Sequence, residues 1–116
     1  MRHRNKGVIL DRPKAAREMM LRNMAASLLL YEKIKTTEAK AKACKPLVEK
    51  MITTAKTGDL TARRSLISNL PQPLAVKKAM DVLGKRYAER PGGYTRIIRL
   101  SKRVGDGAQM VQLELV

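Results

Sequence analysis

The pattern of apolar and polar positions in the first third of the chain predicts one long helix, over about 12–30. Asp11 is typical of a residue that caps a helix, and Pro13 suits a first helical turn. Small and apolar residues then recur on one stripe at helical spacing, namely Ala16, Met20, Met24, Ser27 and Tyr31. We expect this stripe to face the core.

A second helix is predicted after a short linker or strand over residues 31–36. Thr36 or Thr37 can cap this helix, and Gly58 ends it. Its apolar positions closely match the helical template and are Cys44, Leu47, Val48, Met51, Ile52 and Ala55. Pro46 lies inside the pattern. Because the stripe begins before Pro46 and continues past it, we expect one helix with a kink.

Two further helices are predicted before the pattern changes. Asp59 caps the third, which runs to about Asn69 with Leu66, Ile67 and Leu70 on its apolar side. The Pro71-Gln72-Pro73 segment interrupts the chain. The fourth helix has apolar residues at helical spacing, Val76, Ala79, Met80 and Leu83, and Gly84 is its expected C-terminal stop. Residues 85–93 are polar and predict a loop.

The last part of the chain changes to the period of a β-strand. Residues 95–100 and 110–115 are rich in β-formers, and the second run alternates Val111, Leu113 and Leu115 with polar residues. Glycines within 102–107 suit a hairpin loop. The prediction is an α+β fold of four helices packed with a small sheet, formed by a short strand near 32–36 and the C-terminal β-hairpin. Residues 1–10 form an extended basic arm, and 11–116 form a single domain.

The composition limits the kind of core and the classes of function. Hydrophobic residues make up 44% of the chain, as in an ordinary globular protein, but Phe and Trp are absent and Tyr occurs three times. So few aromatic residues argue against a base-stacking sheet surface. A single cysteine excludes an intramolecular disulfide and agrees with a cytoplasmic protein. No apolar run approaches a membrane span, and the basic residues do not form one amphipathic helix, so we expect no membrane partner.

The charge is the strongest functional signal in the sequence. The chain has 25 Lys and Arg against 10 Asp and Glu, for a formal net charge of +15, which favours a polyanion as partner. One basic cluster covers the arm and first helix: Arg2, Arg4, Lys6, Arg12, Lys14, Arg17 and Arg22. A second covers the C-terminal third: Lys85, Arg86, Arg90, Arg96, Arg99, Lys102 and Arg103. The lysines of the second helix, Lys40, Lys42, Lys45 and Lys50, could serve solubility alone.

Catalytic and metal-binding functions find little support. His3 is the only histidine and lies in the arm, where no catalytic pair could be held rigidly. Cys44 falls on the apolar stripe of the second helix and is interpreted as a core residue. One Cys and one His do not suffice for a zinc site. We expect no enzyme activity, no metal, no cofactor and no small-molecule substrate.

Several motifs, taken in order, resemble a known family over the whole chain. They are Met1-Arg2-His3-Arg4, Arg22-Asn23-Met24-Ala25, Lys35-Thr36-Thr37 with Lys40-Ala41-Lys42, Arg63-Arg64 after Gly58-Asp59, Gly92-Gly93-Tyr94-Thr95-Arg96-Ile97, Gly105-Asp106 and Glu114-Leu115-Val116. This combination resembles bacterial large-subunit ribosomal protein seventeen. The resemblance implies an α+β fold and a structural, non-enzymatic role. It also implies binding to large-subunit rRNA near the polypeptide exit tunnel, beside other ribosomal proteins.

The resemblance and the basic clusters together give a set of expected rRNA contacts. Those carried over from the family are Arg2, His3, Arg4, Arg12, Arg17, Arg22, Asn23, Lys35, Thr36 and Arg96. Those added from the clusters and motifs are Lys6, Arg63, Arg64, Tyr94, Arg99, Lys102 and Arg103. Val8 stands where the family often has a basic residue, and Ala16 where it often has histidine. Each departure removes a polar contact.

Two other classes of function remain open at this point. A nucleoid-type DNA-compacting protein would need little more than the charge excess. An RNA-modifying enzyme would need a cofactor pocket, for which the residues give no sign. No helix-turn-helix, zipper or zinc finger is evident, so sequence-specific DNA reading is not favoured. The ribosomal interpretation leads because it accounts for both the charge and the ordered motifs.

Overall fold

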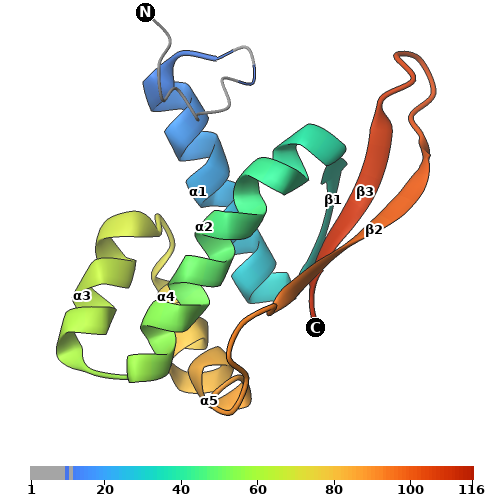
Figure 1. Cartoon of the computed structure of the whole chain (residues 1–116). Coiled ribbons are helices and arrows are strands. Elements are labelled where there is room, and N and C mark those ends of the chain that lie inside the picture. The colour runs from blue at the N-terminus through green and yellow to red at the C-terminus, as the bar shows by residue number, and fades with distance from the viewer. Residues whose placement is uncertain (1–9, 11) are drawn as a thin grey trace, which may run out of the picture.

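A computed structural model describes residue 10 and residues 12–116. It contains α1 (Lys14–Tyr31), β1 (Lys33–Thr37), α2 (Glu38–Thr57), α3 (Leu60–Asn69), α4 (Pro73–Lys78), the π-helical turn η1 (Ala79–Leu83), α5 (Gly84–Arg86), β2 (Thr95–Lys102) and β3 (Gln109–Leu115) (Figure 1). Because α4, η1 and α5 follow one another without a break, the predicted α+β fold with four helices and a small sheet is confirmed. The arm, apart from Leu10, and Asp11 lie outside the described residues.

The three strands form an antiparallel sheet in the order β1-β3-β2. The alternation predicted for β3 is confirmed, because Val111 and Leu113 are fully buried and Leu115 nearly so. Leu113 is paired with Ile34 of β1 on one side and with Ile97 of β2 on the other. The apolar face of the sheet therefore packs on the helices, while the hairpin of β2 and β3 extends beyond them (Figure 1).

Helix α2 carries the largest share of the core, as its sequence pattern predicts. Its buried residues are Ala41, Cys44, Val48, Met51, Ile52 and Ala55, and Leu47 is partly buried against the same cluster. Pro46 lies inside α2, which continues as one helix on both sides of it. Pro46 is exposed, so water can satisfy the carbonyl that lacks its helical N–H partner. The prediction of one helix, not two, is confirmed.

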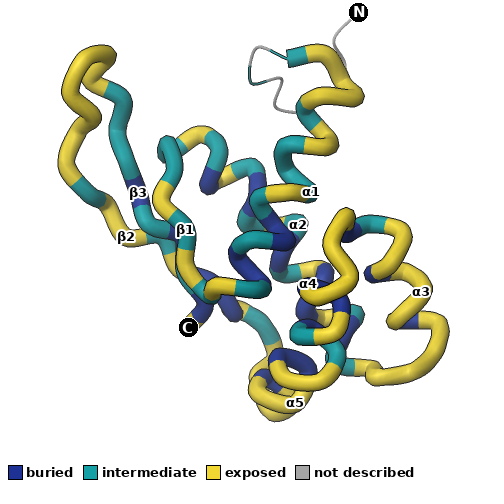
Figure 2. Tube along the Cα trace, turned by 180° about the vertical axis from the view of Figure 1, so that it is seen from behind, coloured by how far each residue is buried: buried dark blue, intermediate teal, exposed yellow. Residues whose placement is uncertain are grey.

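The stripe predicted for α1 is not its main buried face, although Met24 packs against the core. Tyr31 is 72% exposed and Ala16 is exposed as well, whereas the buried residues are Ala25, Ala26, Leu28 and Leu29. Helix α1 has apolar side chains on several sides, and the leucines of its C-terminal half fill more of the core than the predicted set. The N-terminal half of α1 projects from the body (Figure 2). Pro13 is the residue before the first turn and not part of it.

The predicted N-cap of α3 is confirmed, but one of the residues predicted for its buried side is exposed. The Asp59 carboxylate accepts a hydrogen bond from the Ala62 N–H at 2.8 Å. Leu66 and Leu70 are buried, but Ile67 is 58% exposed, and Ala62 takes its place in contact with the body. A short helix at the edge of the molecule buries only a narrow face, and Ile67 lies outside it.

Gly84 was predicted to end the fourth helix, and this was wrong. The helix continues through η1 and α5, and Gly84 is buried in a right-handed helical conformation with φ −57°. A Cβ atom at this position would lie 2.8 Å from the carbonyl oxygen of Ala55 in α2. Glycine is therefore required for the close approach of two helices, not for a turn.

Replacing Gly84 by Ala should destabilise the protein, because the added methyl group would press on the α2 backbone. We expect a loss of about 1–3 kcal/mol in the free energy of unfolding, measured by urea denaturation. Lys85→Ala, at the exposed neighbouring position, should stay within about 0.5 kcal/mol of wild type. Wild-type stability for Gly84→Ala would show that this contact does not limit the packing.

Glu32 joins four elements at the C-terminal end of α1. Its backbone has φ 68°, and its N–H donates to the carbonyl of Leu28. Its carboxylate accepts hydrogen bonds from Lys78 of α4 at 2.9 Å and from Arg86 of α5. Its carbonyl accepts from the N–H of Leu115 in β3 at 2.9 Å. The hydrogen bonds from Arg86 and then Lys78 lower the pKa of Glu32 from 4.5 to about 2.

This lowered pKa predicts a specific loss of stability in acid. A carboxylate with a folded pKa below its unfolded value stabilises the fold above the unfolded pKa, and that contribution disappears as the pH falls through the folded pKa. Glu32→Gln should therefore be less stable than wild type near pH 7. The difference should shrink as the pH falls from 4.5 toward 2, the interval between the two pKa values.

Urea denaturation across this pH range checks the prediction, with Glu89→Gln as an exposed carboxylate control. The control should follow the wild-type profile. A difference between Glu32→Gln and wild type that stays constant with pH would mean that the ion pairs contribute nothing.

Candidate nucleic-acid interface

Three segments that are distant in sequence meet in one positively charged groove. Its lining comes from the residues before α1, from the start of α2 and from the β2–β3 loop, and its volume is about 450 Å³. We call it the basic groove, and its residues are Leu10, Arg12, Thr37, Ala39, Lys40 and Arg103. It brings together Arg12 of the N-terminal basic cluster and Arg103 of the C-terminal one, which are far apart in the sequence.

The start of α2 adds helix N–H groups to the basic groove, and the Glu38 carboxylate in its first turn is paired with Lys42 and Arg99. Thr37 occupies the N-cap position of this 20-residue helix, and its side chain makes no capping hydrogen bond. The first N–H groups of a helix carry a partial positive charge and attract anions. The basic groove thus combines three cationic side chains with a helix N-terminus, an arrangement that suits phosphate.

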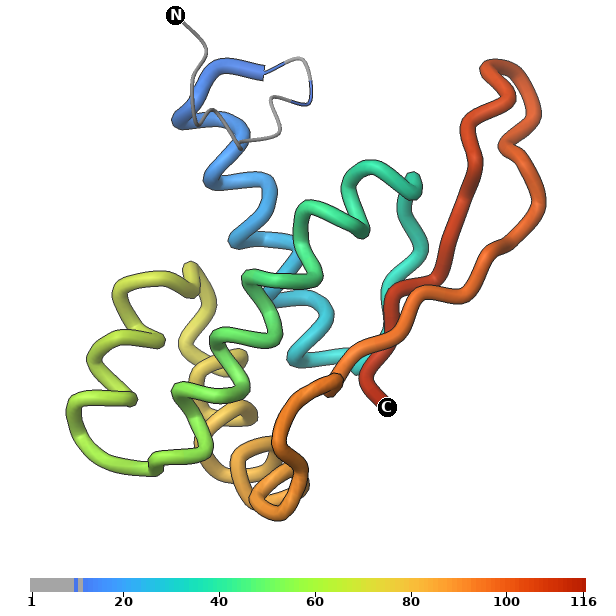
Figure 3. Tube along the Cα trace, viewed as in Figure 1, coloured from blue at the N-terminus to red at the C-terminus, as the bar shows by residue number. Residues whose placement is uncertain are grey.

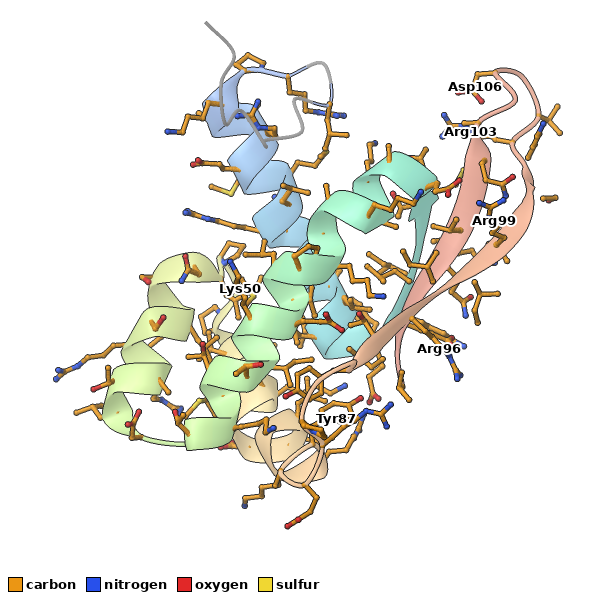
Figure 4. All side chains as sticks on the ribbon, viewed as in Figure 1. Lys50, Tyr87, Arg96, Arg99, Arg103 and Asp106 are labelled. Carbon is orange, nitrogen blue, oxygen red and sulfur yellow. The ribbon has the colours of Figure 1, made fainter. Side chains whose placement is uncertain are left out.

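The arginines of the hairpin are paired with carboxylates on the protein itself. Arg96 pairs with Glu114, Arg99 with Glu38 at 3.3 Å, and Arg103 with Asp106 at the hairpin tip (Figure 4). The hydrogen bond from Arg103 lowers the pKa of Asp106 well below its usual range. Glu38 also accepts from Lys42 at 3.0 Å, and that hydrogen bond is the main cause of its lowered pKa.

These pairs leave the hairpin less positive than its sequence suggests. The three arginine side chains are all at least half exposed, and exposed ion pairs are weak and screened by salt. A phosphate can therefore compete for each guanidinium. Lys102 is exposed on the same hairpin, and no carboxylate of the described residues lies within 4 Å of it.

A second groove lies between α1 and β1, and it is mainly apolar. It has a volume of about 660 Å³, and it contains three of the expected contacts, Asn23, Lys35 and Thr36. We call it the apolar groove, and the described residues that line it are Ala16, Met19, Met20, Asn23, Met24, Ser27, Ile34, Lys35 and Thr36. Four residues of the stripe predicted for α1, namely Ala16, Met20, Met24 and Ser27, line this groove.

The remaining expected contacts are scattered. Arg17 and Arg22 are half-buried on α1. Arg63 and Arg64 are exposed on α3, which lies on the side of the molecule opposite the hairpin (Figure 3). Arg2, His3, Arg4 and Lys6 lie outside the described residues.

Tyr94 belongs to the core and does not form part of the surface. It is 2% exposed, and its ring lies 5.2 Å from that of Tyr87. Lys56 donates a hydrogen bond to its hydroxyl oxygen at 3.0 Å, and this bond lowers the pKa of Tyr94. A side chain held in this way is not free to stack on a base, so we no longer include it among the expected contacts.

Lys40 is a site residue that the sequence pattern did not select. It was grouped with lysines that could serve solubility alone, but it lines the basic groove beside Arg12 and Arg103. The available signal was its position in the first turn after the N-cap residue Thr37. The methionines of the apolar groove were assigned to the core because helical spacing does not distinguish a buried face from a groove.

Three features that would indicate other functions were sought within residues 12–116. No cluster of three or more His, Cys, Asp or Glu residues there could hold a metal ion. Cys44 is fully buried, and burial raises the pKa of its thiol to about 12, which is unsuitable for a nucleophile. None of the helices in this range combines the length and the apolar character that a membrane span requires.

The fold and its grooves define a small basic α+β protein suited to contact with a polyanion. The family model described as Ribosomal protein L17 matches residues 20–116. Relatives named large ribosomal subunit protein bL17 align with the whole chain. Those of Solibacter usitatus, Rickettsia typhi and Dehalococcoides mccartyi are 51%, 48% and 47% identical, over 77%, 85% and 99% of their own lengths. The chain belongs to the ribosomal protein L17 family.

Family membership confirms the resemblance found in the sequence. It gives the chain a structural role in the ribosome and not an enzymatic one. It also favours the ribosomal interpretation over the DNA-compacting and RNA-modifying alternatives, since the match extends over nearly the entire chain.

Proposed function

We propose that this protein binds and stabilises folded rRNA as a structural constituent of the large ribosomal subunit. The observation that carries the proposal is the basic groove, in which Arg12, Lys40 and Arg103 converge from three segments. The relatives support the subunit assignment, since each is named a large ribosomal subunit protein.

Binding would depend mainly on phosphate contacts and RNA shape. Arginine guanidinium groups bind phosphate in a bidentate manner, and lysine supplies a point charge. Segments of RNA repel each other where they converge, and cations held by a rigid body reduce that repulsion. The packing of α1, α2 and the hairpin fixes the spacing of these cations, so the groove would select RNA folds whose phosphates match it.

The proposed location is near the polypeptide exit tunnel, beside neighbouring large-subunit proteins. The support for this location is the resemblance of the ordered motifs to the family. The exposed surface of α3, with Arg63 and Arg64, lies away from the basic groove and is available for a further rRNA segment or a neighbouring protein (Figure 3).

The proposal predicts a steep dependence of rRNA binding on salt. With roughly six to ten phosphate contacts, affinity for large-subunit rRNA should fall about a thousandfold or more between 50 and 200 mM salt. Lys40→Ala should reduce the slope of log affinity against log salt by about 1, because one phosphate contact is lost. Filter binding over a salt series measures both quantities.

Lys77→Ala is the matched control, since Lys77 is an exposed lysine on α4 and does not line the basic groove. It should keep the wild-type slope. Duplex DNA of equal length serves as competitor and should displace rRNA poorly. A flat salt profile, or equal competition by DNA, would refute the proposal.

A further inference from the structure

We propose that the apolar groove between α1 and β1 holds an unpaired nucleobase of the bound RNA. This inference rests on the proposed function, because it assumes that rRNA occupies the neighbouring basic groove. It adds a site that reads a base to a surface otherwise suited to phosphates.

The lining of the apolar groove has the chemistry that a nucleotide requires. Three methionines, with Ala16 and Ile34, provide an apolar surface for the faces of a planar ring. Asn23, Ser27 and Thr36 offer neutral donors and acceptors for the edge of a base, and Lys35 offers a cation for its phosphate. Among the described residues, no carboxylate lines the groove. An apolar cleft with a few convergent polar groups is typical of a small-molecule site.

The methionines of the apolar groove are only partly used by the core, since Met24 packs against it and Met19 and Met20 are not among its residues. Met19 is 49% exposed, and Met20 and Met24 are only partly buried, although all three lie on the same side of α1. Contiguous apolar surface with a polar rim marks a binding site. Thioether side chains are flexible and polarisable, so they adapt to an aromatic ring. No tyrosine is among the described residues that line this groove, so its methionines provide the surface for contact with a base.

The apolar groove and the basic groove are lined by neighbouring stretches of the chain. Thr36 lines the apolar groove and the next residue, Thr37, lines the basic groove. At the other wall, Ala16 follows Arg12 by only four residues. An RNA strand whose phosphates occupy the basic groove can therefore direct an adjacent unstacked base between α1 and β1. Proteins commonly recognise RNA through such splayed-out bases.

Filling the apolar groove tests the inference. Ser27→Phe places an aromatic side chain in it, and Asn23→Ala removes the amide at an exposed position where folding does not depend on it. Ser27→Phe should weaken binding to large-subunit rRNA about tenfold or more, in keeping with the loss of one stacked base. Asn23→Ala should weaken it by a smaller factor. The salt slope should not change for either variant, because no phosphate contact is lost.

Leu74→Phe is the control, since it places the same aromatic side chain at a 68% exposed position of α4, outside both grooves. It should bind as wild type does. Circular dichroism and thermal melting verify that each variant is folded. In addition, large-subunit rRNA substituted with 4-thiouridine should give photocrosslinks within the peptide Met19–Met24.

The outcomes separate this inference from the proposed function. If wild type binds rRNA and Ser27→Phe binds equally well, or if no crosslink falls within Met19–Met24, the nucleobase site is refuted and the rRNA-binding function stands. If Ser27→Phe lowers the salt slope, the groove contacts phosphates and the inference is also refuted. If wild type itself does not bind rRNA, the proposed function fails first.

Discussion

The packing of helix α2 is the constraint on which the rest of the structure depends. Its buried face contacts α1, α3, β3 and the helical segment of η1 and α5 (Figure 1). The residues of this face are small or aliphatic, so neighbouring elements approach closely, most of all where Ala55 meets Gly84. In the part of the chain described, no buried side-chain nitrogen or oxygen lacks a hydrogen-bond partner. A modest core without Phe or Trp can hold a single arrangement because its polar groups are satisfied and its helices are in direct contact.

This packing also positions the candidate interface. Strand β1 pairs with the central strand β3 and leads directly into α2, which places the N-terminus of α2 beside the hairpin loop. The same junction separates the apolar groove at Thr36 from the basic groove at Thr37. Two of the carboxylates link separate elements of the fold. Glu32 ties α1 to α4 and α5, and Glu38 ties α2 to β2. Most of the excess positive charge is thereby left at the surface for an external polyanion.

The positions of the helices and strands could be predicted from the sequence better than the faces they bury and the contacts they make. For α2 the apolar stripe, the N-cap residue and the end at Gly58 could all be read from spacing, because one face is uniformly buried. In α1 the same method failed, since its apolar residues fall on both a core face and a groove. Gly84 was misread because a glycine that permits close packing looks, in sequence, like one that ends a helix. Tertiary contacts bring Arg12, Lys40 and Arg103 together, and no local sequence pattern encodes such contacts. The same is true of the ion pairs that Arg96 and Arg99 form with Glu114 and Glu38.

The central claim is that the basic groove is the surface that meets rRNA, and directed hydroxyl-radical probing tests it most directly. Ala39→Cys in the basic groove and Ser68→Cys on α3 each provide one exposed thiol for an iron chelate, while Cys44 is fully buried. With the labelled proteins assembled into large subunits, the Ala39 position should cut rRNA strongly, at nucleotides around the tunnel exit. The Ser68 position should cut it less or elsewhere. Strong cleavage from Ser68 with none from Ala39 would contradict the account.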